Sequence, residues 1–264
     1  MDNNIHRAGA GDSFWQIVGI GMDSEAGIRI NKYLSEAGFC SRREADRLVT
    51  EGRVTIGTAV ALIGSRVLPG DEVKVDGRLA GAPADKVVYA FNKPVGYISS
   101  LSDKQGKGIS RFFPKGQRLF PIGRLDKDSD GLMLLTNDGG LMNSILSAAN
   151  GHEKEYSVVV DKAITQDFIS KMEQGVEILN KATNERVRTA PCKVTAESER
   201  CFRIILIQGL NRQIRRMCEE LSYKVVSLTR IRIMNVKLGN LGEGSVRRLS
   251  DIEEKELYRG QINE

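Results

Sequence analysis

Histidine and long apolar runs are scarce in this sequence, and each scarcity argues against a class of protein. Only two histidines, His6 and His152, occur among 264 residues. Mechanisms that need a histidine base or several imidazole metal ligands are therefore hard to build, which favours carboxylate, arginine, lysine or tyrosine chemistry. No stretch reaches the roughly 20 consecutive apolar residues of a membrane helix. We also find no secretion signal, because no basic segment precedes an apolar run near the start.

Cysteines are few and widely spaced. The four cysteines form no C-x-x-C pair, so neither a zinc site nor a disulfide framework is indicated. We expect reduced thiols in a cytoplasmic protein. A Walker A loop, a G-x-G-x-x-G turn and a metal-ligand cluster are also missing, which fits a protein without a cofactor. The cysteines are Cys40, Cys192, Cys201 and Cys218.

The composition is that of an ordinary soluble globular protein, with 41% apolar and 28% charged residues. The formal net charge is +5. A basic balance of this size favours a polyanionic partner such as nucleic acid. Nothing in the sequence indicates a coiled coil or a large exposed apolar helix, so we expect a monomer.

Residues 28–80 have the pattern of a small module that follows a poorly ordered leader, residues 1–27. Apolar residues at helical spacing begin at Ile30, and Gly38 ends that helix. Ser41 can cap a second helix, and Glu44 can reach back to the Ser41 amide. Short strands are expected at 54–56 and 72–75. A linker at residues 81–86, rich in small residues, leads to the next domain.

Basic residues gather on the second helix of this module. They are Arg42, Arg43 and Arg47, with Arg53 just beyond. Two interpretations stay open at this point: a solvated basic helix face, or a face that binds phosphates. RNA affinity depends largely on such positive surfaces.

Residues 87–258 are β-rich and form the second expected domain. Strands and helices mix without a regular βαβ repeat, which predicts an α+β fold with a largely antiparallel sheet. The expected strands are 87–92, 132–136, 155–160, 186–194 and 203–208, and the expected helices are 141–148, 165–174 and 211–221.

The densest cluster of charge is residues 123–131, where Asp126, Asp128 and Asp130 alternate before an apolar run. The spacing matches the opening of an EF-hand, but the twelfth position is Asn137 rather than a bidentate glutamate, and a strand is expected to follow. A solvated acidic turn is the second interpretation. The third is a working carboxylate at Asp126, whose neighbours Arg124 and Lys127 favour the ionised form.

Several segments together carry a resemblance to known families. Residues 29–34, 40–46, 52–54 and 70–73 resemble the S4 RNA-binding domain. The Gly-Arg-Leu-Asp motif at 123–126, followed by an apolar strand and Thr-Asn-Asp-Gly at 136–139, resembles the central motif of pseudouridine synthases, in the branch with an N-terminal S4 domain. Residues 92–96, 154–158 and 208–217 resemble further motifs of that family, in the family's order.

The resemblance implies an isomerase that turns uridine into pseudouridine at a specific site in structured RNA. Asp126 would be the nucleophile or base beside C1′ of a flipped-out nucleotide, and Arg215 would pair with it. Tyr156 would stack on the target base, although its phenol could instead move a proton. Arg124 would fill the gap that the base leaves.

Other roles are less specific. Lys93 is expected to be structural or to contact phosphate, and Arg216 either contacts phosphate at the surface or belongs to the site. Arg42, Arg43 and Arg47 of the S4 module would bind RNA. The resemblance favours a uridine in 23S rRNA, with a tRNA anticodon-loop uridine as another candidate. A different class of function also stays open: an RNA-binding or ribosome-assembly factor whose larger domain is vestigial.

Overall fold

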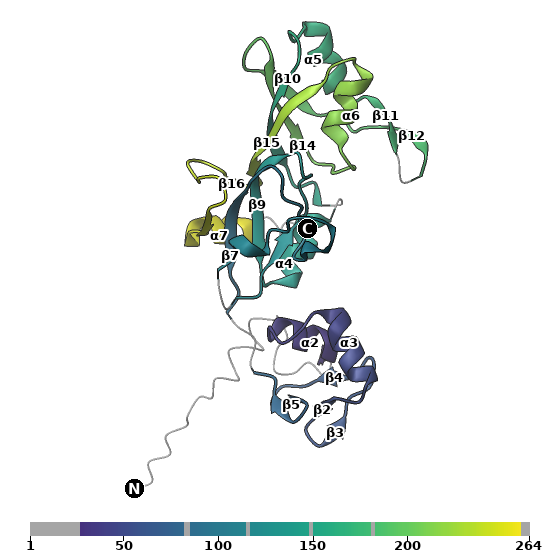
Figure 1. Cartoon of the computed structure of the whole chain (residues 1–264), viewed down its shortest axis with the longest axis vertical. Helices are drawn as coiled ribbons and strands as arrows, with labels where there is room; N and C mark the ends of the chain where they lie inside the picture. Colours follow the sequence, from purple (N-terminus) through teal and green to yellow (C-terminus); the bar gives the residue numbers. More distant parts are fainter. Residues whose placement is uncertain (1–26, 82–84, 115–116, 148–149, 181–182, 260–264) are drawn as a thin grey trace. The chain divides into compact units, whose positions relative to one another are not determined.

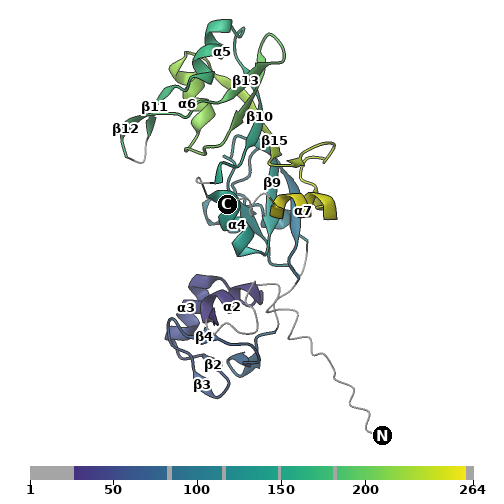
Figure 2. The same ribbon diagram turned by 180° about the vertical axis from the view of Figure 1, so that it is seen from behind.

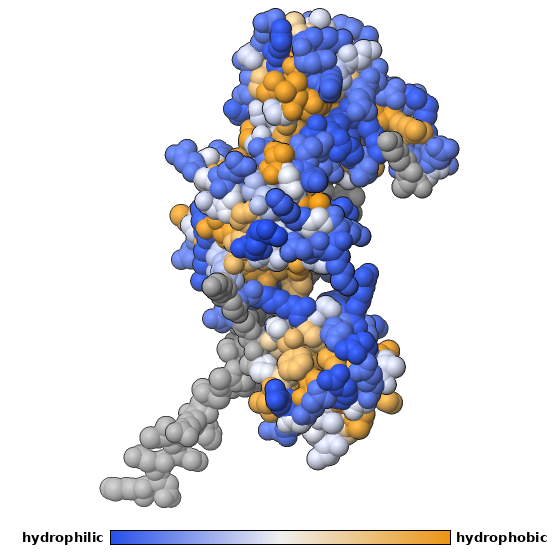
Figure 3. Space-filling model, in the orientation of Figure 1, coloured by the Kyte–Doolittle hydropathy of each residue, from blue (hydrophilic) through white to orange (hydrophobic). Residues whose placement is uncertain are grey.

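The chain folds into two compact units, and the boundary in the sequence lies between Lys86 and Val87 (Figures 1 and 2). The computed structural model describes residues 27–81, 85–114, 117–147, 150–180 and 183–259. The expected leader lies outside the described residues except for Gly27, and so does the middle of the expected linker. The face seen in Figure 3 is mainly hydrophilic with apolar patches interspersed. No helix in the described ranges is long and apolar enough to cross a membrane.

The N-terminal unit packs two helices against short strands. Strand β2 pairs antiparallel with β3 and with β5, β5 pairs with β6, and β1 pairs with β4. One apolar core joins the helices to the strands and includes the fully buried Leu34, Ala45 and Val54. The elements are β1 (Ile28–Arg29), α2 (Ile30–Glu36), α3 (Arg42–Thr50), β2 (Val54–Ile56), β3 (Ala59–Val60), β4 (Arg66–Val67), β5 (Val73–Val75) and β6 (Arg78–Leu79).

The start of α3 confirms half of the expected capping pattern. The Ser41 hydroxyl accepts a hydrogen bond of 3.1 Å from the Glu44 amide, so one free donor of the helix end is satisfied. The reciprocal contact is absent, because the Glu44 carboxylate binds the Arg47 guanidinium instead. An arginine one turn along the helix therefore replaces the Ser41 amide as the partner of Glu44.

The second unit is built on one large mixed sheet with the strand order β13-β14-β10-β15-β9-β7-β17. The described pairings are antiparallel except between β15 and β9. The α+β class with a largely antiparallel sheet is confirmed. Its strands are β7 (Val88–Lys93), β8 (Phe120–Ile122), β9 (Asp130–Thr136), β10 (Lys154–Val160), β13 (Lys193–Ala196), β14 (Cys201–Leu206), β15 (Val225–Ile233), β16 (Val236–Lys237) and β17 (Val246–Arg248).

Strand β9 is buried on both faces, which explains its continuous apolar run. Leu132 and Leu134 pack into one core with α4 and α7, whereas Met133 and Leu135 pack into another core on the opposite face. Successive side chains of a strand alternate between faces, so a strand covered on both sides must be apolar throughout. This burial holds the residues just before Asp130 in a fixed place.

Helices cover both ends of this sheet (Figures 1 and 2). A third core contains α5 and α6 with residues of β10, β14 and β15, including Phe168, Phe202 and Met217. The hairpin of β11 and β12 extends away from the sheet in both views. The remaining elements are α4 (Gly139–Leu146), α5 (Gln166–Glu173), β11 (Glu177–Asn180), β12 (Glu185–Arg188), α6 (Gln213–Glu220), α7 (Asp251–Arg259) and the 3-10 turns Asp103–Gln105 and Ser110–Phe112.

One expected element is wrong. The single strand expected at 186–194 is two strands, β12 and β13, which belong to different sheets. Pro191 lies between them and cannot donate a backbone hydrogen bond to a ladder. Thr189 is buried in the break, where its hydroxyl accepts a 3.0 Å hydrogen bond from the Val176 amide. The apolar pattern hid this corner because residues on both sides of it are strand formers.

Candidate active site

The loop between β8 and β9 carries Asp126 and is held from several sides. The Ser99 hydroxyl donates to the Leu125 carbonyl at 2.6 Å and accepts from the Leu125 amide at 2.9 Å. The Gly96 amide donates to the Lys127 carbonyl at 2.7 Å. Buried Arg230 donates to the Arg124 carbonyl at 3.4 Å. The backbone on both sides of Asp126 is thus fixed before any substrate arrives.

Gly131 ends the loop at a place where a side chain cannot fit. Its φ is +99°, and a Cβ built there would lie 2.4 Å from the Arg230 carbonyl oxygen. This close approach is the parallel pairing of β9 with β15, in which Gly131 faces Arg230. The glycine therefore lets the loop that carries Asp126 enter the sheet.

Asp126 lines a hollow of about 290 Å³ with Tyr156, Arg124, Arg212 and Arg215. The carboxylate side chain is 35% exposed, so it can meet a substrate while part of it contacts protein. The hollow lies among β10, the start of α6 and the loop before β9. Residues far apart in the sequence therefore provide one concave surface with an anion, an aromatic ring and several cations.

Arg212 is the cation nearest to Asp126. Its Nη1 lies 3.5 Å from Oδ2 of Asp126. The same guanidinium binds both oxygens of Asp128, at 3.0 and 2.8 Å. Hydrogen bonds from Arg212, with the charge of Arg215, hold the pKa of the Asp128 carboxyl below its usual value. Arg212 precedes α6 in a left-handed conformation, with φ of 52°.

The expected ion pair between Arg215 and Asp126 is not present among the described residues. Arg215 instead donates to the Asp128 carbonyl at 2.6 Å and to the Ser129 hydroxyl at 3.1 Å. Its Nε lies 3.4 Å from the Asp128 carboxylate. Arg215 is buried on α6, whereas Arg212, at the start of that helix, reaches the Asp126 carboxylate. Arg215 therefore supports the loop that carries Asp126.

Tyr156 lies on β10 and is half-buried beside the hollow. Its ring packs against two of the apolar cores, which holds the ring in place. No hydrogen bond of its hydroxyl is found within the described part of the chain. The ring can thus offer a face to a base, and the hydroxyl stays available.

The other predicted site residues have different environments. Arg124 is exposed and lines the hollow. Lys93 is fully buried and donates to the carbonyls of Pro94 and Tyr97 at 2.7 and 2.9 Å. Burial lowers the pKa of Lys93 to about 8, although the three loop aspartates oppose this shift. Lys93 therefore stabilises the turn at residues 94–97, and its side chain is shielded from solvent.

Arg216 does not line the hollow. It donates to the Leu179 carbonyl at 3.0 Å and to the Asn211 side chain at 2.7 Å. It thereby ties α6 to β11, and it is not among the residues that line the hollow. Asp130 also has a local partner, since it accepts a 2.6 Å hydrogen bond from Thr229. The loop continues into β9 and not into a helix, which contradicts the EF-hand interpretation.

Comparisons with known proteins cover both units of the chain. Residues 87–220 match the family model described as RNA pseudouridylate synthase, and residues 28–73 match that of the S4 domain. The chain belongs to the RNA pseudouridylate synthase family. It is an enzyme with pseudouridine synthase activity on RNA, and its N-terminal unit is an S4 RNA-binding domain.

The similarity extends to individual relatives within the family. It is 50% identical over 240 residues to the dual-specificity RNA pseudouridine synthase RluF of Escherichia coli K12, an alignment that covers 90% of this chain and 81% of the relative. It is 34% identical to ribosomal large subunit pseudouridine synthase B of Bacillus subtilis, over 87% of this chain and 95% of the relative. A crystal structure of a pseudouridylate synthase matches with a TM-score of 0.64 and 27% identity, over 88% of this chain and 100% of that chain.

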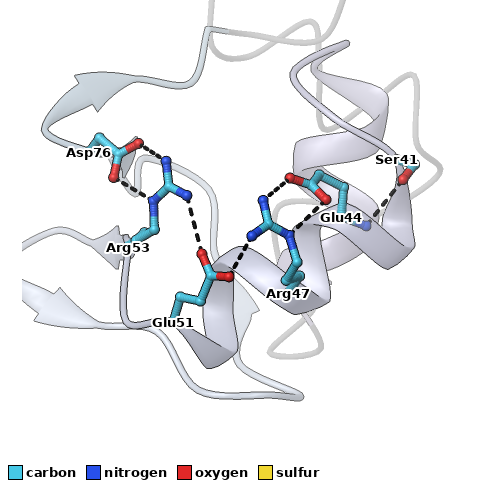
Figure 4. Close-up of polar contacts among 6 residues, drawn as sticks. All are labelled: Ser41, Glu44, Arg47, Glu51, Arg53 and Asp76. Atoms are coloured by element: carbon cyan, nitrogen blue, oxygen red, sulfur yellow. Dashed lines mark hydrogen bonds and ion pairs between the residues drawn. The ribbon is translucent and has the colours of Figure 1, made fainter.

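The S4 domain of the synthase contains both unpaired arginines and arginines in ion pairs. Arg42 and Arg43 are exposed at the start of α3, and neither side chain has a partner among the described residues. Arg47 is bound by Glu44 and Glu51 (Figure 4).

The ion pairs extend beyond α3. Glu51 also contacts Arg53, and Arg53 binds Asp76 at 2.8 and 2.6 Å (Figure 4). This chain of alternating charges connects α3 to the turn after β5. The four arginines that form one basic cluster in the sequence thus differ in the structure, because two of their guanidinium groups are already in ion pairs.

Sequence reasoning missed several residues of this site. Arg212 was inside a recognised motif but was not singled out, although a charged residue at the start of a helix beside an acidic loop was a usable signal. Ser99 and Arg230 carried no signal, because their roles depend on backbone groups of a distant loop. Within the described ranges, no group of three or more His, Cys, Asp or Glu residues is placed to hold a metal ion.

Proposed function

We propose that this synthase isomerises a specific uridine in structured RNA and that Asp126 is the catalytic carboxylate. The observation that supports this most is the position of Asp126 in a hollow shared with Tyr156 and three arginines. The reaction breaks the N1–C1′ bond, turns the uracil and rejoins it through C5. An ionised aspartate beside C1′ can act as nucleophile or as base, whereas asparagine cannot.

The cations and the ring have complementary tasks. Arg212 lies 3.5 Å from Asp126 and orients the carboxylate toward the hollow. Tyr156 stacks on the uracil and offsets part of the few kcal/mol that unstacking costs. Arg124 is exposed at the edge of the hollow and can occupy the space that the flipped nucleotide leaves. Arg215 and Lys93 act through the loop and not on the base.

The substrate that we propose is 23S rRNA, with a tRNA anticodon-loop uridine as a second substrate. Two relatives support this assignment by name, one as a dual-specificity enzyme and one as a ribosomal large subunit enzyme. Folded RNA is recognised mostly through shape and through exposed single-stranded loops. Arg42 and Arg43 of the S4 domain offer unpaired charge for phosphates of such a fold.

Asp126→Asn tests the chemical step. Tritium release from RNA labelled at C5 of uridine should fall to background in this variant, because asparagine supplies neither a nucleophile nor a base. The control is Asp167→Asn, which removes an exposed carboxylate on α5 that pairs with Lys171. Tritium release by Asp126→Asn at the rate of the control would overturn the proposed mechanism.

Mapping of pseudouridine in rRNA and tRNA from a strain that lacks the gene tests the substrate. A pseudouridine that disappears from 23S rRNA and returns with the intact protein, but not with Asp126→Asn, is the expected result. An unchanged map would contradict the substrate assignment and would favour the RNA-binding alternative. In that case Arg42→Ala with Arg43→Ala should still impair association with RNA.

A further inference from the structure

A second hollow lies on the other side of Arg124. It is lined by Ile98, Ser99, Ser100 and Gln105 together with Arg124. Arg124 also lines the hollow of Asp126, so the two hollows share one exposed cationic wall. A polymer substrate that places one residue at Asp126 therefore passes a neighbouring residue along this second surface.

The segment that forms the second hollow is rigidly built. The Asp103 carboxylate accepts a 2.6 Å hydrogen bond from the Gly108 amide and binds Arg111. The Ile98 amide donates to the Lys107 carbonyl and the Ile109 amide to the Ser100 carbonyl, each at 2.9 Å. These contacts close the segment into a compact loop whose shape does not depend on a ligand.

Two residues anchor this loop to the fold. Ile109 is fully buried in the core under Phe91 and Met133. A Cβ at Gly108 would lie 2.7 Å from the Ser100 carbonyl oxygen. The two backbone segments of the loop therefore lie too close together for a side chain at this position. A preorganised surface of this kind loses little conformational freedom on binding.

The groups that the loop offers to solvent suit a nucleotide. Lys104, Gln105 and Lys107 are exposed, and none of their side chains has a partner within the described residues. The one acid of this segment, Asp103, is occupied by Arg111 and the Gly108 amide. The free groups are thus two ammonium ions, which suit phosphates, and one carboxamide, which offers a donor and an acceptor to a base edge.

The Ser99 side chain connects this loop to the loop that carries Asp126. Ser99, which lines the second hollow, bonds both the amide and the carbonyl of Leu125, next to Asp126. Arg124 and Ser99 make the second hollow an extension of the site.

We propose that residues 98–107 form a subsite for the nucleotide that flanks the target uridine. The Gln105 carboxamide contacts the edge of that base, and Lys104 and Lys107 contact the adjoining phosphates. This inference rests on the proposed function, because it needs RNA whose uridine lies at Asp126. It makes Gln105 a determinant of sequence specificity and leaves the chemistry to Asp126.

A substrate library tests the subsite. RNA stem-loops that contain the target uridine are randomised at the positions flanking it, and the relative kcat/KM of each sequence is measured by tritium release. The wild-type enzyme should prefer one base at one flanking position, and Gln105→Ala should lose roughly tenfold or more of that preference. Gln166→Ala, an exposed glutamine at the start of α5, is the matched control and should keep the preference.

Replacement of Lys104 and Lys107 should have a different effect from replacement of Gln105. Lys104→Ala with Lys107→Ala should lower kcat/KM evenly across the library and reduce the salt dependence of binding, by about 0.7 to 0.9 in log–log slope for each phosphate that is no longer bound. Lys224→Ala, an exposed lysine after α6, should change neither property. An identical library profile for wild type and Gln105→Ala, or a wild type without flanking preference, would overturn the subsite while the enzyme stays active. Absence of tritium release from every RNA would overturn the proposed function as well.

Discussion

Arg212 joins two acids of the loop before β9: its guanidinium binds both carboxylate oxygens of Asp128 and lies 3.5 Å from Asp126. Asp128 thus orients the arginine, and the arginine faces the carboxylate that we assign to chemistry. Arg215 also holds Asp128, since it donates to the Asp128 carbonyl and its Nε lies beside the Asp128 carboxylate. Asp128 is therefore fully engaged by two arginines, and we propose that it positions Arg212.

Replacement of Arg212 should slow the reaction without unfolding the enzyme. Arg212→Asn is the suitable change, because asparagine tolerates the left-handed backbone found there. Loss of a charged hydrogen bond is worth about 1.5–3 kcal/mol, so kcat/KM should fall roughly 10- to 150-fold. Arg200→Asn, at an exposed loop position, should retain activity. Wild-type kinetics for Arg212→Asn would show that Asp126 does not need this cation.

Gly131→Ala should destabilise the catalytic unit strongly. The new methyl group would meet the Arg230 carbonyl at 2.4 Å, and the φ of +99° is unfavourable for any side chain. We expect a loss of about 2–3 kcal/mol or more in the free energy of unfolding. Gly239→Ala is the control: its φ is also positive, at +54°, but no atom lies within 4 Å of the added Cβ. Equal thermal midpoints for the two variants would contradict the close approach.

Lys93 should make stability depend on pH in the alkaline range. Burial lowers its pKa from 10.5 to about 8, so between these pH values the unfolded chain binds more protons than the folded one. The free energy of unfolding should therefore rise with pH in this window, by up to about 3 kcal/mol, and the contribution should be constant below it.

Comparison with Lys93→Met isolates this effect, because other groups titrate equally in both proteins. The difference in unfolding free energy between wild type and variant should increase from pH 8 to pH 10.5, as measured by denaturant titration. Lys224→Met, a change at an exposed lysine, is the control and should show no such trend. A constant difference across the window for Lys93→Met would mean that Lys93 is not buried as a cation.

The arginines of the S4 domain should contribute unequally to RNA affinity. Arg42→Ala with Arg43→Ala should weaken binding and reduce the salt slope by about 0.7 to 0.9 for each phosphate that the variant fails to bind. Arg47→Ala should have a smaller effect, because Glu44 and Glu51 already neutralise that guanidinium. Arg53→Ala, which also removes a paired arginine, is its control. A larger loss for Arg47→Ala than for the double variant would reverse this order.

Local signals in the sequence were reliable where neighbouring residues decide the structure. Ser41 and Thr165 cap the helices that were expected to follow them, since an N-cap needs only a side chain and the next turn of backbone. The apolar run at 132–135 became a central strand, because burial on both faces leaves no room for polar side chains. The motif order likewise indicated the family before any contact was known.

Contacts between distant segments were decided by the tertiary structure. Sequence motifs predicted that Arg215 pairs with Asp126, but Arg212 reaches it instead, because Arg215 is buried and Arg212 adopts a left-handed turn before α6. The division of the S4 arginines into paired and unpaired groups also depends on Asp76, which lies in the turn after β5. Sequence by itself thus determined the chemistry available to this protein, while packing decided which charges meet, because ion pairs form only where the fold brings their ends within a few ångströms.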